Sequence, residues 1–584
     1  MNDSLPRIYV LGLLMLPLLG AAVVAALGPA RKEAIRRVAL IVTSAILVMS
    51  LLLAWRFVDI KRTITPPPGE LPTFKPYFVP GSPGVVRDGA GNERGRDPHR
   101  TSWNILTVGR GAIQFYLGVD GFNVWLVVLT GVLSVPAVLI SWNQITERVN
   151  EFYAWLLALQ MAMMGIFLSF DIILFYVFFE LSLVPLFFLI GIWGGPERRH
   201  AAGKFFIFTL TGSLITLLGV LGVVLACQAK SGELTFAIPR LVEIVHSRLA
   251  IESERDFWLT TQYWVFLALL AGFAVKVPLV PFHTWLPLAH VEAPTAGSVD
   301  LAGVLLKVGA YGFLRLCVPL APDVSLSLGL PLVSSLAAFG IVYGAFCAYA
   351  QDDIKKMVAY SSVSHLGLCM LGMFALNPAG VAGSLMQMIN HGLSTAGLFL
   401  LVGMLYERYH TRKISDFSGM ATKMPLLAAA MVFICLTSVG LPGLNGFIGE
   451  ALALFGVFDQ QYSHGEFPWY AVIASSGMIL GAWYLFTMLQ KVFFGDLREP
   501  HVMHHDGAPP ITDLDSRELA LIAPILLLCV LIGVHPQPLL NAMRPEVETI
   551  ARIADVARER VVADAQPPGQ PPVGFAKNTK EQAP

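Results

Sequence analysis

Long apolar segments recur along the whole chain, and no other feature constrains its fold as strongly. A run of about 18 or more apolar residues is long enough to cross the hydrocarbon core of a bilayer as a helix. Hydrophobic residues make up 55% of the 584 residues and charged residues only 14%, whereas a soluble domain carries roughly 25% charged residues. The pattern predicts an all-α polytopic membrane protein. Its transmembrane helices, about fourteen in number, are expected at residues 8–27, 36–55, 121–142, 152–169, 172–193, 204–227, 261–281, 297–318, 328–350, 354–376, 380–406, 425–457, 470–494 and 518–538.

Charge and cysteine usage exclude several classes of protein. The net charge is zero, with 40 basic and 40 acidic residues, so nothing indicates a nucleic-acid partner. The six cysteines stand singly in apolar runs, without a CxxC pair or a Cys/His cluster, and are expected to pack as small residues inside helices. We therefore expect no iron–sulfur cluster and no metal site in this chain. The aromatic runs are expected to face lipid or to pack in the core, and not to form a cofactor-binding site.

Basic residues are distributed unequally between the connections that join the spans. Pairs such as Arg31 with Lys32 and Lys355 with Lys356 follow odd-numbered spans, whereas the short connections after spans 4, 10 and 12 hold none. The positive-inside rule then places the odd-to-even connections in the cytoplasm and both termini on the outer face. The polar insert in residues 60–110, rich in Pro, Gly and Arg, is expected to be an external loop or cover. The tail from residue 563 to 584 is expected to be disordered.

Two predicted spans are interrupted in matching ways, span 7 by Pro278 and Pro281 and span 12 by Pro442 and Gly443. Each is the fourth member of a five-span run, and an odd number of spans turns the second run upside down relative to the first. Broken helices in two inverted halves are typical of transporters, where they line the ion path. Two ordinary proline kinks are the alternative. The expected organisation is two helices with the polar insert in 1–120, a third helix and loop in 121–151, five-helix repeats in 152–318 and 328–495, and a last helix with the tail in 496–584.

Ionisable residues inside the spans are the candidate functional groups. Each costs about 2.5–3.5 kcal/mol at the centre of a membrane helix, so partners or water are expected. A carboxylate close to a buried lysine keeps the lysine protonated, and its withdrawal releases the proton. A Glu–Lys pair can therefore act as a switchable proton site, with histidines as further steps. A structural ion pair and hydrogen-bonded core histidines are the alternatives. The six candidates are Glu180, Lys276, Lys307, His365, His391 and Glu450; Lys204, Asp300 and Arg315, nearer the span ends, are interpreted as anchors or interface residues.

At these residues the chain resembles the antiporter-like proton-pumping subunits of respiratory complex I. Within that group it is most similar to subunit M, the subunit-4 type of NADH-quinone oxidoreductase. The resemblance covers about residues 120–495 and rests on the motifs FFELSLVPLFFLIGIWGG, FAVKVPLVPFHTWLPLAHVEAPTAGSVDLAGVLLKVGAYGFLR, SSVSHLGL, NHGLSTAGLFLLVGMLYER and LPGLNGFIGE. Related subunits usually carry lysine at the position of Glu450, and this difference favours the subunit M type.

The resemblance implies a proton path made of a coupled ion pair, a central lysine, a histidine relay and a terminal proton site. In that order these are Glu180 with Lys276, Lys307, His365 with His391, and Glu450. The implied function is that of a proton-translocating membrane-arm subunit of NADH-quinone oxidoreductase, which couples electron transfer to pumping and has no catalytic redox residue of its own.

The resemblance also implies partners and a location. The partners are the other membrane-arm subunits and membrane lipid, and flavin, iron–sulfur clusters and quinone are expected in other subunits. The expected location is an energy-coupling membrane, the inner membrane of a bacterium. Three alternatives remain: a subunit of a multi-component Na⁺/H⁺ antiporter, a subunit of a ferredoxin- or hydrogenase-linked proton pump, and a structural membrane scaffold.

Overall fold

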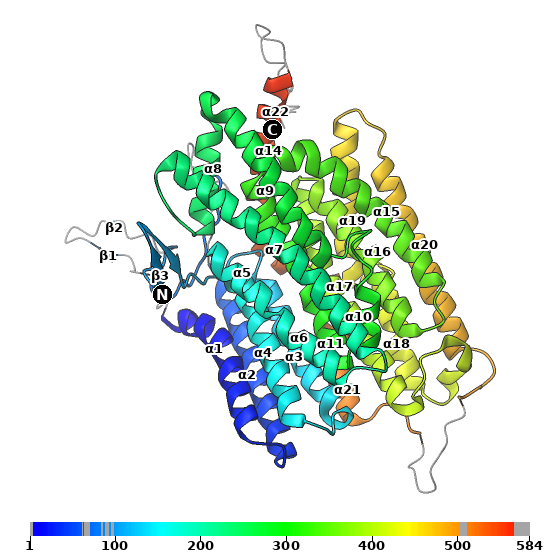
Figure 1. Cartoon of the computed structure of the whole chain (residues 1–584). Helices are drawn as coiled ribbons and strands as arrows, with labels where there is room; N and C mark the ends of the chain where they lie inside the picture. The colour runs from blue at the N-terminus through cyan, green and yellow to red at the C-terminus, as the bar shows by residue number, and fades with distance from the viewer. Residues whose placement is uncertain are drawn as a thin grey trace.

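The computed structural model describes residues 4–60, 62, 71–82, 86–87, 93–94, 99–500 and 511–565. Long helices lie side by side in one bundle (Figure 1). A helix satisfies all its backbone polar groups internally, which is what a segment in lipid requires. The long uninterrupted helices are α1 (Ser4–Ala26), α2 (Lys32–Val58), α3 (Val124–Gln144), α4 (Val149–Leu168), α7 (Arg198–Ser231), α9 (Arg255–Lys276), α15 (Leu330–Tyr349), α16 (Ile354–Phe374), α17 (Pro378–Tyr409), α20 (Trp469–Phe493) and α21 (Ser516–Val534).

Thirteen helical segments of the described residues are long and apolar enough to cross a membrane, which confirms the all-α polytopic class. The remaining predicted span, 425–457, is divided into α18 (Pro425–Ser438) and α19 (Asn445–Ser463). The segment Thr295–Leu320 and the apolar middle of helix α17 are enclosed by other parts of the protein, whereas α1 and α2 lie at one edge of the bundle (Figure 1). The enclosed spans form the centre of the molecule.

Several spans consist of short helical pieces. Span 5 contains α5 (Ile172–Leu181) and α6 (Leu183–Trp193). Span 8 is wound more loosely than an α-helix in two π-helical segments, and such segments frequently mark functional sites. The pieces around spans 7 to 9 are α10 (Leu286–Glu292), α11 (Thr295–Asp300), a π-helical segment Leu301–Leu305, α12 (Leu306–Gly312), a π-helical segment Phe313–Cys317, α13 (Val318–Leu320), α14 (Pro322–Val324) and a π-helical segment Ser325–Gly329.

The two breaks expected from proline and glycine lie between helices. Pro278 and Pro281 lie in the connection from α9 to α10, and Pro442 and Gly443 lie in the connection from α18 to α19. At each break a side chain binds a backbone carbonyl, as the low-dielectric environment favours. The Trp285 Nε1–H donates to the carbonyl of Val275 at 3.0 Å. At the second break, Asn390 Nδ2 donates to the carbonyl of Asn445 at 2.6 Å. The inverted relation of the two five-helix runs stays a prediction.

Connections after odd-numbered spans meet on one side of the bundle, which we call the basic side. Lys32 Nζ donates to the carbonyl of Thr146 at 2.8 Å, joining the connections after spans 1 and 3. Lys355, which the sequence places in a connection, is instead buried near the start of α16, and its Nζ donates to the carbonyl of Ala293 at 2.6 Å. Two 3₁₀ helices on this side are Ile414–Asp416 and Met420–Thr422.

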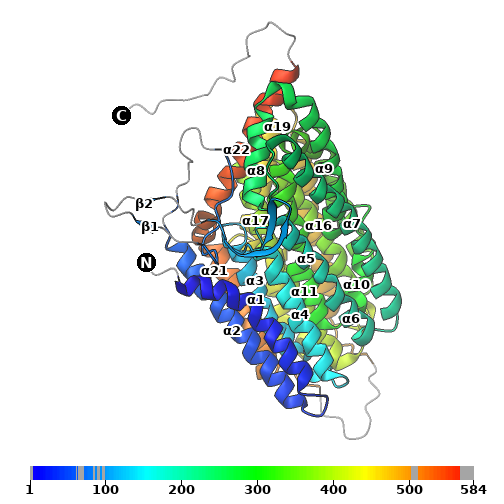
Figure 2. The same cartoon turned by 60° about the vertical axis from the view of Figure 1, so that its left-hand side comes forward.

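The opposite side, which we call the terminus side, carries elements that the apolar pattern does not predict. Helix α22 is too polar to span a membrane, and it runs along the outside of the bundle (Figure 2). The expectation of disorder from residue 563 is wrong for residues 563–565, which form the end of α22. Residues 566–584 and part of the insert lie outside the described residues. The elements on this side are the antiparallel pairs β1 (Val86–Arg87) with β2 (Glu93–Arg94) and β3 (Asn104–Val108) with β4 (Gly111–Gln114), helix α8 (Ile238–Leu249), the 3₁₀ helix Glu252–Glu254 and α22 (Gln537–Ala565).

Candidate functional site

Lys307 and His391 meet at the centre of the bundle. Lys307 follows the π-helical segment of span 8 and is completely buried. Its Nζ donates to the carbonyl of Ala302 and lies 2.8 Å from Nδ1 of His391 on α17. An ammonium group has no acceptor atom, so with Lys307 charged the imidazole accepts at Nδ1 and carries its own proton on Nε2. The sequence does not reveal this contact, which joins residues 84 positions apart.

Beyond His391, the series continues to His365 and Glu450. The ring centroids of His391 and His365 are 5.8 Å apart, and Nδ1 of His365 lies 3.4 Å from a carboxylate oxygen of Glu450. Glu450 is buried on α19, where it also accepts a hydrogen bond from Gln387 Nε2 at 3.3 Å. A cavity of about 10 Å³ touches all three titratable side chains, and this is about the space that one water molecule needs.

Polar atoms that have no hydrogen-bond partner among the described residues are concentrated around this small cavity. A buried polar atom left without a hydrogen bond costs about 1–3 kcal/mol, so a dry cavity with this lining would be strongly unfavourable. Water molecules are the simplest partners for such atoms, and they are also what a proton needs between groups that do not touch. The atoms are Oε1 of Gln387, Oδ1 of Asn390, Nε2 of His391, Oγ1 of Thr437, Oγ of Ser438, Nδ2 and Oδ1 of Asn445, and Oε2 of Glu450.

Lys276 and Glu180 lie in the first half of the chain, at helix ends. Lys276 is the last residue of α9 and is buried, with its Nζ 5.0 Å from the ring centroid of Phe179. Glu180 is its acidic electrostatic neighbour, but this carboxylate accepts a hydrogen bond from the Tyr176 hydroxyl at 2.8 Å. A cation over an aromatic face is stabilised without a direct carboxylate contact. The switchable ion pair therefore stays a prediction.

A larger cavity, of about 590 Å³, opens on the basic side and reaches Lys355 and Thr295. Close to its floor lies His290, which is completely buried and stacks on Phe399 with ring centroids 4.7 Å apart. Neither ring nitrogen of His290 has a hydrogen-bond partner among the described residues. Its charged neighbours are Lys355 and Lys307, so His290 lies between the cavity and the central lysine. His290 is not among the candidates expected from the sequence, although it falls within the motif that contains Lys276.

Two residues interpreted as anchors are buried instead. Asp300 on α11 is enclosed, and one of its carboxylate oxygens has no partner among the described residues. Arg315 is also enclosed, and its guanidinium pairs with Asp120 at 2.6 Å. From their positions in the sequence, both residues were expected near the ends of a span. Span 8 is surrounded by protein along its length, so no part of it reaches lipid headgroups.

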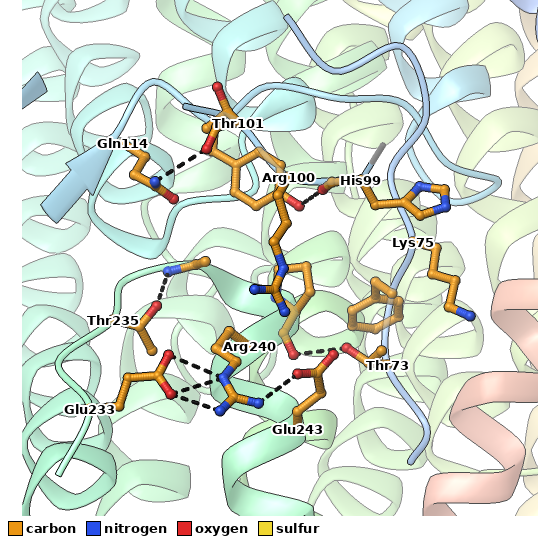
Figure 3. A pocket seen from close by; sticks show the side chains of 14 residues that line it. Thr73, Lys75, His99, Arg100, Thr101, Gln114, Glu233, Thr235, Arg240 and Glu243 are labelled. Carbon is orange, nitrogen blue, oxygen red and sulfur yellow. Dashed lines mark hydrogen bonds and ion pairs between the residues drawn. The ribbon is translucent and has the colours of Figure 1, made fainter. Parts of the chain in front are cut away.

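A separate polar cavity of about 380 Å³ lies on the terminus side, between the insert and the connection from α7 to α8 (Figure 3). Arg240 forms ion pairs with Glu233 at 2.7 Å and with Glu243 at 3.0 Å. The guanidinium of Arg240 lowers the pKa of Glu233 below its ordinary value, and Arg100 adds to this effect. These charges neutralise one another at the surface, and none of the six candidate residues lines this cavity.

Gly440 makes room for the Glu450 carboxylate. Its φ is +78°, and a Cβ atom at this position would lie 2.4 Å from Oε2 of Glu450. We expect Gly440→Ala to lower the free energy of unfolding by about 1–3 kcal/mol and to impair proton translocation by displacing the carboxylate. Gly465→Ala is the matched control, because Gly465 has φ +73° but open space around it. Equal proton translocation in the two variants would contradict a role for the contact with Glu450.

The broken helices and the buried series of titratable side chains define an ion-translocating membrane protein of the antiporter-like class. No cluster of three or more His, Cys, Asp or Glu side chains fit to hold a metal occurs in the part of the chain that the structure describes. The family described as NADH:quinone oxidoreductase/Mrp antiporter, transmembrane, matches residues 169–475.

The relatives narrow this class. NADH-quinone oxidoreductase subunit M of Pseudomonas aeruginosa is 41% identical over 454 residues, which are 76% of this chain and 84% of that protein. The subunit M of Rhodobacter capsulatus is 40% identical over 438 residues, 74% of this chain and 81% of the relative. A chain of respiratory complex I from Thermus thermophilus matches with a TM-score of 0.74 and 30% identity, covering 94% of this chain and 99% of that one. The chain belongs to the NADH-quinone oxidoreductase subunit M family.

Proposed function

We propose that this chain translocates protons as a membrane-arm subunit of NADH-quinone oxidoreductase. The observation that carries the proposal is the series Lys307, His391, His365 and Glu450, which crosses the centre of the bundle through one direct contact and one small cavity. Proton transfer needs groups within hydrogen-bond reach or joined by one water. Direct contact serves the first step, and a bridging water serves the step between the histidines.

The chemistry of the series is a relay of bound protons. Lys307 in its charged form gives a proton to Nδ1 of His391, and His391 releases the proton on Nε2 toward the cavity. After this exchange His391 is neutral, with its proton on Nδ1 and not on Nε2. A rotation of the imidazole ring, or a return of both protons, restores the first tautomer. His365 then passes the proton to the Glu450 carboxylate. No redox group is required of this chain, and we infer that flavin, iron–sulfur clusters and quinone belong to other subunits of the complex.

Lys276 and Glu180 are proposed as the switch that drives the relay. Moving one charge against about 100 mV takes about 2.3 kcal/mol. A change of about 2 in a pKa corresponds to about 2.7 kcal/mol. A modest approach of the Glu180 carboxylate to Lys276, or its withdrawal toward Tyr176, is therefore sufficient in energy. The aromatic face of Phe179 stabilises the lysine in the withdrawn arrangement.

His290 is proposed as the step between the basic-side cavity and Lys307. Its buried, unpartnered ring nitrogens can hold water and exchange a proton with the cavity. We expect His290→Leu to slow NADH-driven proton translocation at least about tenfold, measured with a pH dye in proteoliposomes that contain the whole complex. Glutamine in His290→Gln can still hold water but cannot bind a proton. This variant therefore separates the role of His290 in holding water from its role in proton exchange.

The exposed His464, replaced by leucine, is the control for His290. Wild-type pumping in His290→Leu would show that proton uptake follows another route.

The assignment to an electron-driven complex has its own test. We propose that the basic side faces the cytoplasm of a bacterium and that the termini face outward, because basic residues are concentrated on the connections that stay inside. Gentle purification of the complex that contains this chain should recover flavin, iron–sulfur clusters and NADH–quinone activity. Recovery with small membrane partners and Na⁺/H⁺ exchange, but without redox centres, would favour the antiporter alternative.

A further inference from the structure

Four charged side chains form a buried cluster on the terminus side that the proton relay does not use. Arg315, in the span that carries Lys307, pairs with Asp120 through both guanidinium nitrogens, at 2.6 and 2.8 Å. Asp120 lies in the turn before α3, and it also accepts the backbone N–H of Phe122 at 3.0 Å. The guanidinium of Arg315 is further enclosed by aromatic rings, including that of Phe170 at 4.6 Å. This half of the cluster is held by a fully buried ion pair.

The other half of the cluster comes from α22. Glu546 pairs with Arg62, which follows α2, at 2.7 Å, and only 7% of either side chain is exposed. The second guanidinium nitrogen of Arg62 donates to the carbonyl of Ala542. The backbone N–H of Gly121 also faces the Glu546 carboxylate, and a Cβ atom on Gly121 would lie 2.2 Å from it. Helix α22 therefore packs tightly against the turn before α3.

Glu546 faces three titratable or charged neighbours on other elements. These are Arg62 after α2, Asp120 with its partner Arg315, and Tyr77 in the insert. On its own helix, Arg544 and Glu548 pair with each other near the surface. Burial and the adjacent Asp120 carboxylate raise the pKa of Glu546 to about 7, against the opposing effect of Arg62. Two buried carboxylates side by side do not both ionise easily.

The C-terminal end of α22 contacts the region just after span 8. Arg560 pairs with Asp323 on α14 at 2.7 Å, and the Gln262 side chain from α9 donates to the same carboxylate at 3.1 Å. Arg558 donates to the carbonyl of Leu376 at 3.2 Å. The helix thus crosses the terminus side, with Glu546 next to the Asp120–Arg315 pair of span 8 and Arg560 paired with Asp323 just after span 8.

We propose that Glu546 is a proton-binding residue of the terminus side, and that its protonation tightens the attachment of α22 across the ends of α2, α3 and span 8. The ligand is the proton itself, taken from the water on this side. Because span 8 carries Lys307, the attachment links acidity on the terminus side to the helix that holds the central lysine. This proposal does not depend on the route of the proton relay.

The sign of the pH dependence follows from linkage. The docked Glu546 has a pKa of about 7, whereas an exposed glutamate has a pKa of about 4.3. Between these values the docked state binds more protons than the released state, so attachment strengthens as pH falls and weakens as pH rises through about 7. A single group with these two pKa values changes the docking equilibrium about tenfold between pH 8 and pH 6.

Hydrogen–deuterium exchange of α22 in the intact purified complex tests the proposal. After correction for the intrinsic exchange rate, protection of the α22 amides should rise about tenfold from pH 8 to pH 6 in the wild type. Glu546→Gln, which cannot titrate, should abolish this dependence. Arg62→Met removes the opposing cation and should move the midpoint to higher pH, provided that the helix stays attached.

Glu548→Gln is the matched control, because Glu548 lies on the same helix and is partly exposed; it should keep the wild-type dependence. Protection that does not vary with pH in the wild type would overturn the proposal, and so would a Glu546→Gln variant that titrates like the wild type. The test measures amide exchange and does not depend on proton pumping. A failure of this proposal can therefore be distinguished from a failure of the proposed function.

Discussion

Replacing Lys307 by methionine is expected to lower NADH-driven proton translocation at least about tenfold. Methionine keeps most of the length of the side chain but removes the proton that His391 receives. Lys307 is completely buried, and its contact with His391 at 2.8 Å is shorter than the 3.4 Å approach of His365 to Glu450.

The experiment compares proton translocation with assembly. Proteoliposomes that contain the whole complex report pumping through a pH-sensitive dye, and native electrophoresis with flavin quantification reports assembly. Lys356→Met is the control, because Lys356 lies on α16 but is exposed at the surface. Normal pumping by a fully assembled Lys307→Met complex would disprove the relay. Loss of assembly would call for Lys307→Arg, which keeps a charge but hardly releases a proton.

Replacing Glu450 by glutamine is expected to have an effect of similar size. The amide retains the shape of the side chain and its hydrogen bond with Gln387, but it cannot accept the proton from His365. Glu450→Lys should retain part of the activity, because an amine at this place can still bind and release a proton. A lysine near His365 does add a like charge, so we expect pumping between that of glutamine and that of the wild type.

The two Glu450 variants distinguish titration from structure. Proton translocation per NADH oxidised is the measured quantity, and Glu466→Gln, at an exposed site after α19, is the control. If the lysine variant were as inactive as the glutamine variant, the carboxylate would be needed for its geometry and not for its proton. Full activity of Glu450→Gln would remove Glu450 from the path.

These two sites mark the limits of what could be predicted from sequence. The presence of Lys307 and Glu450 inside apolar spans is visible residue by residue, because the cost of a charge in a membrane does not depend on distant parts of the chain. The pairing of Lys307 with His391 is not visible in this way. The buried position of His290 between Lys307 and the basic-side cavity was also missed, since a histidine near a broken helix has the same sequence signal whether it is exposed or enclosed.

The sequence by itself determined the membrane class, the approximate positions of thirteen of the fourteen expected spans and the two helix breaks, and it supplied the six candidate residues. Hydrophobicity over a span and the conformational limits of proline and glycine are local properties, so they can be read along the chain. Only the tertiary structure decided which polar groups meet. The Arg62–Glu546 pair joins residues 484 positions apart, and α22 is amphipathic rather than apolar. Such contacts arise from packing between distant segments, which no local pattern specifies.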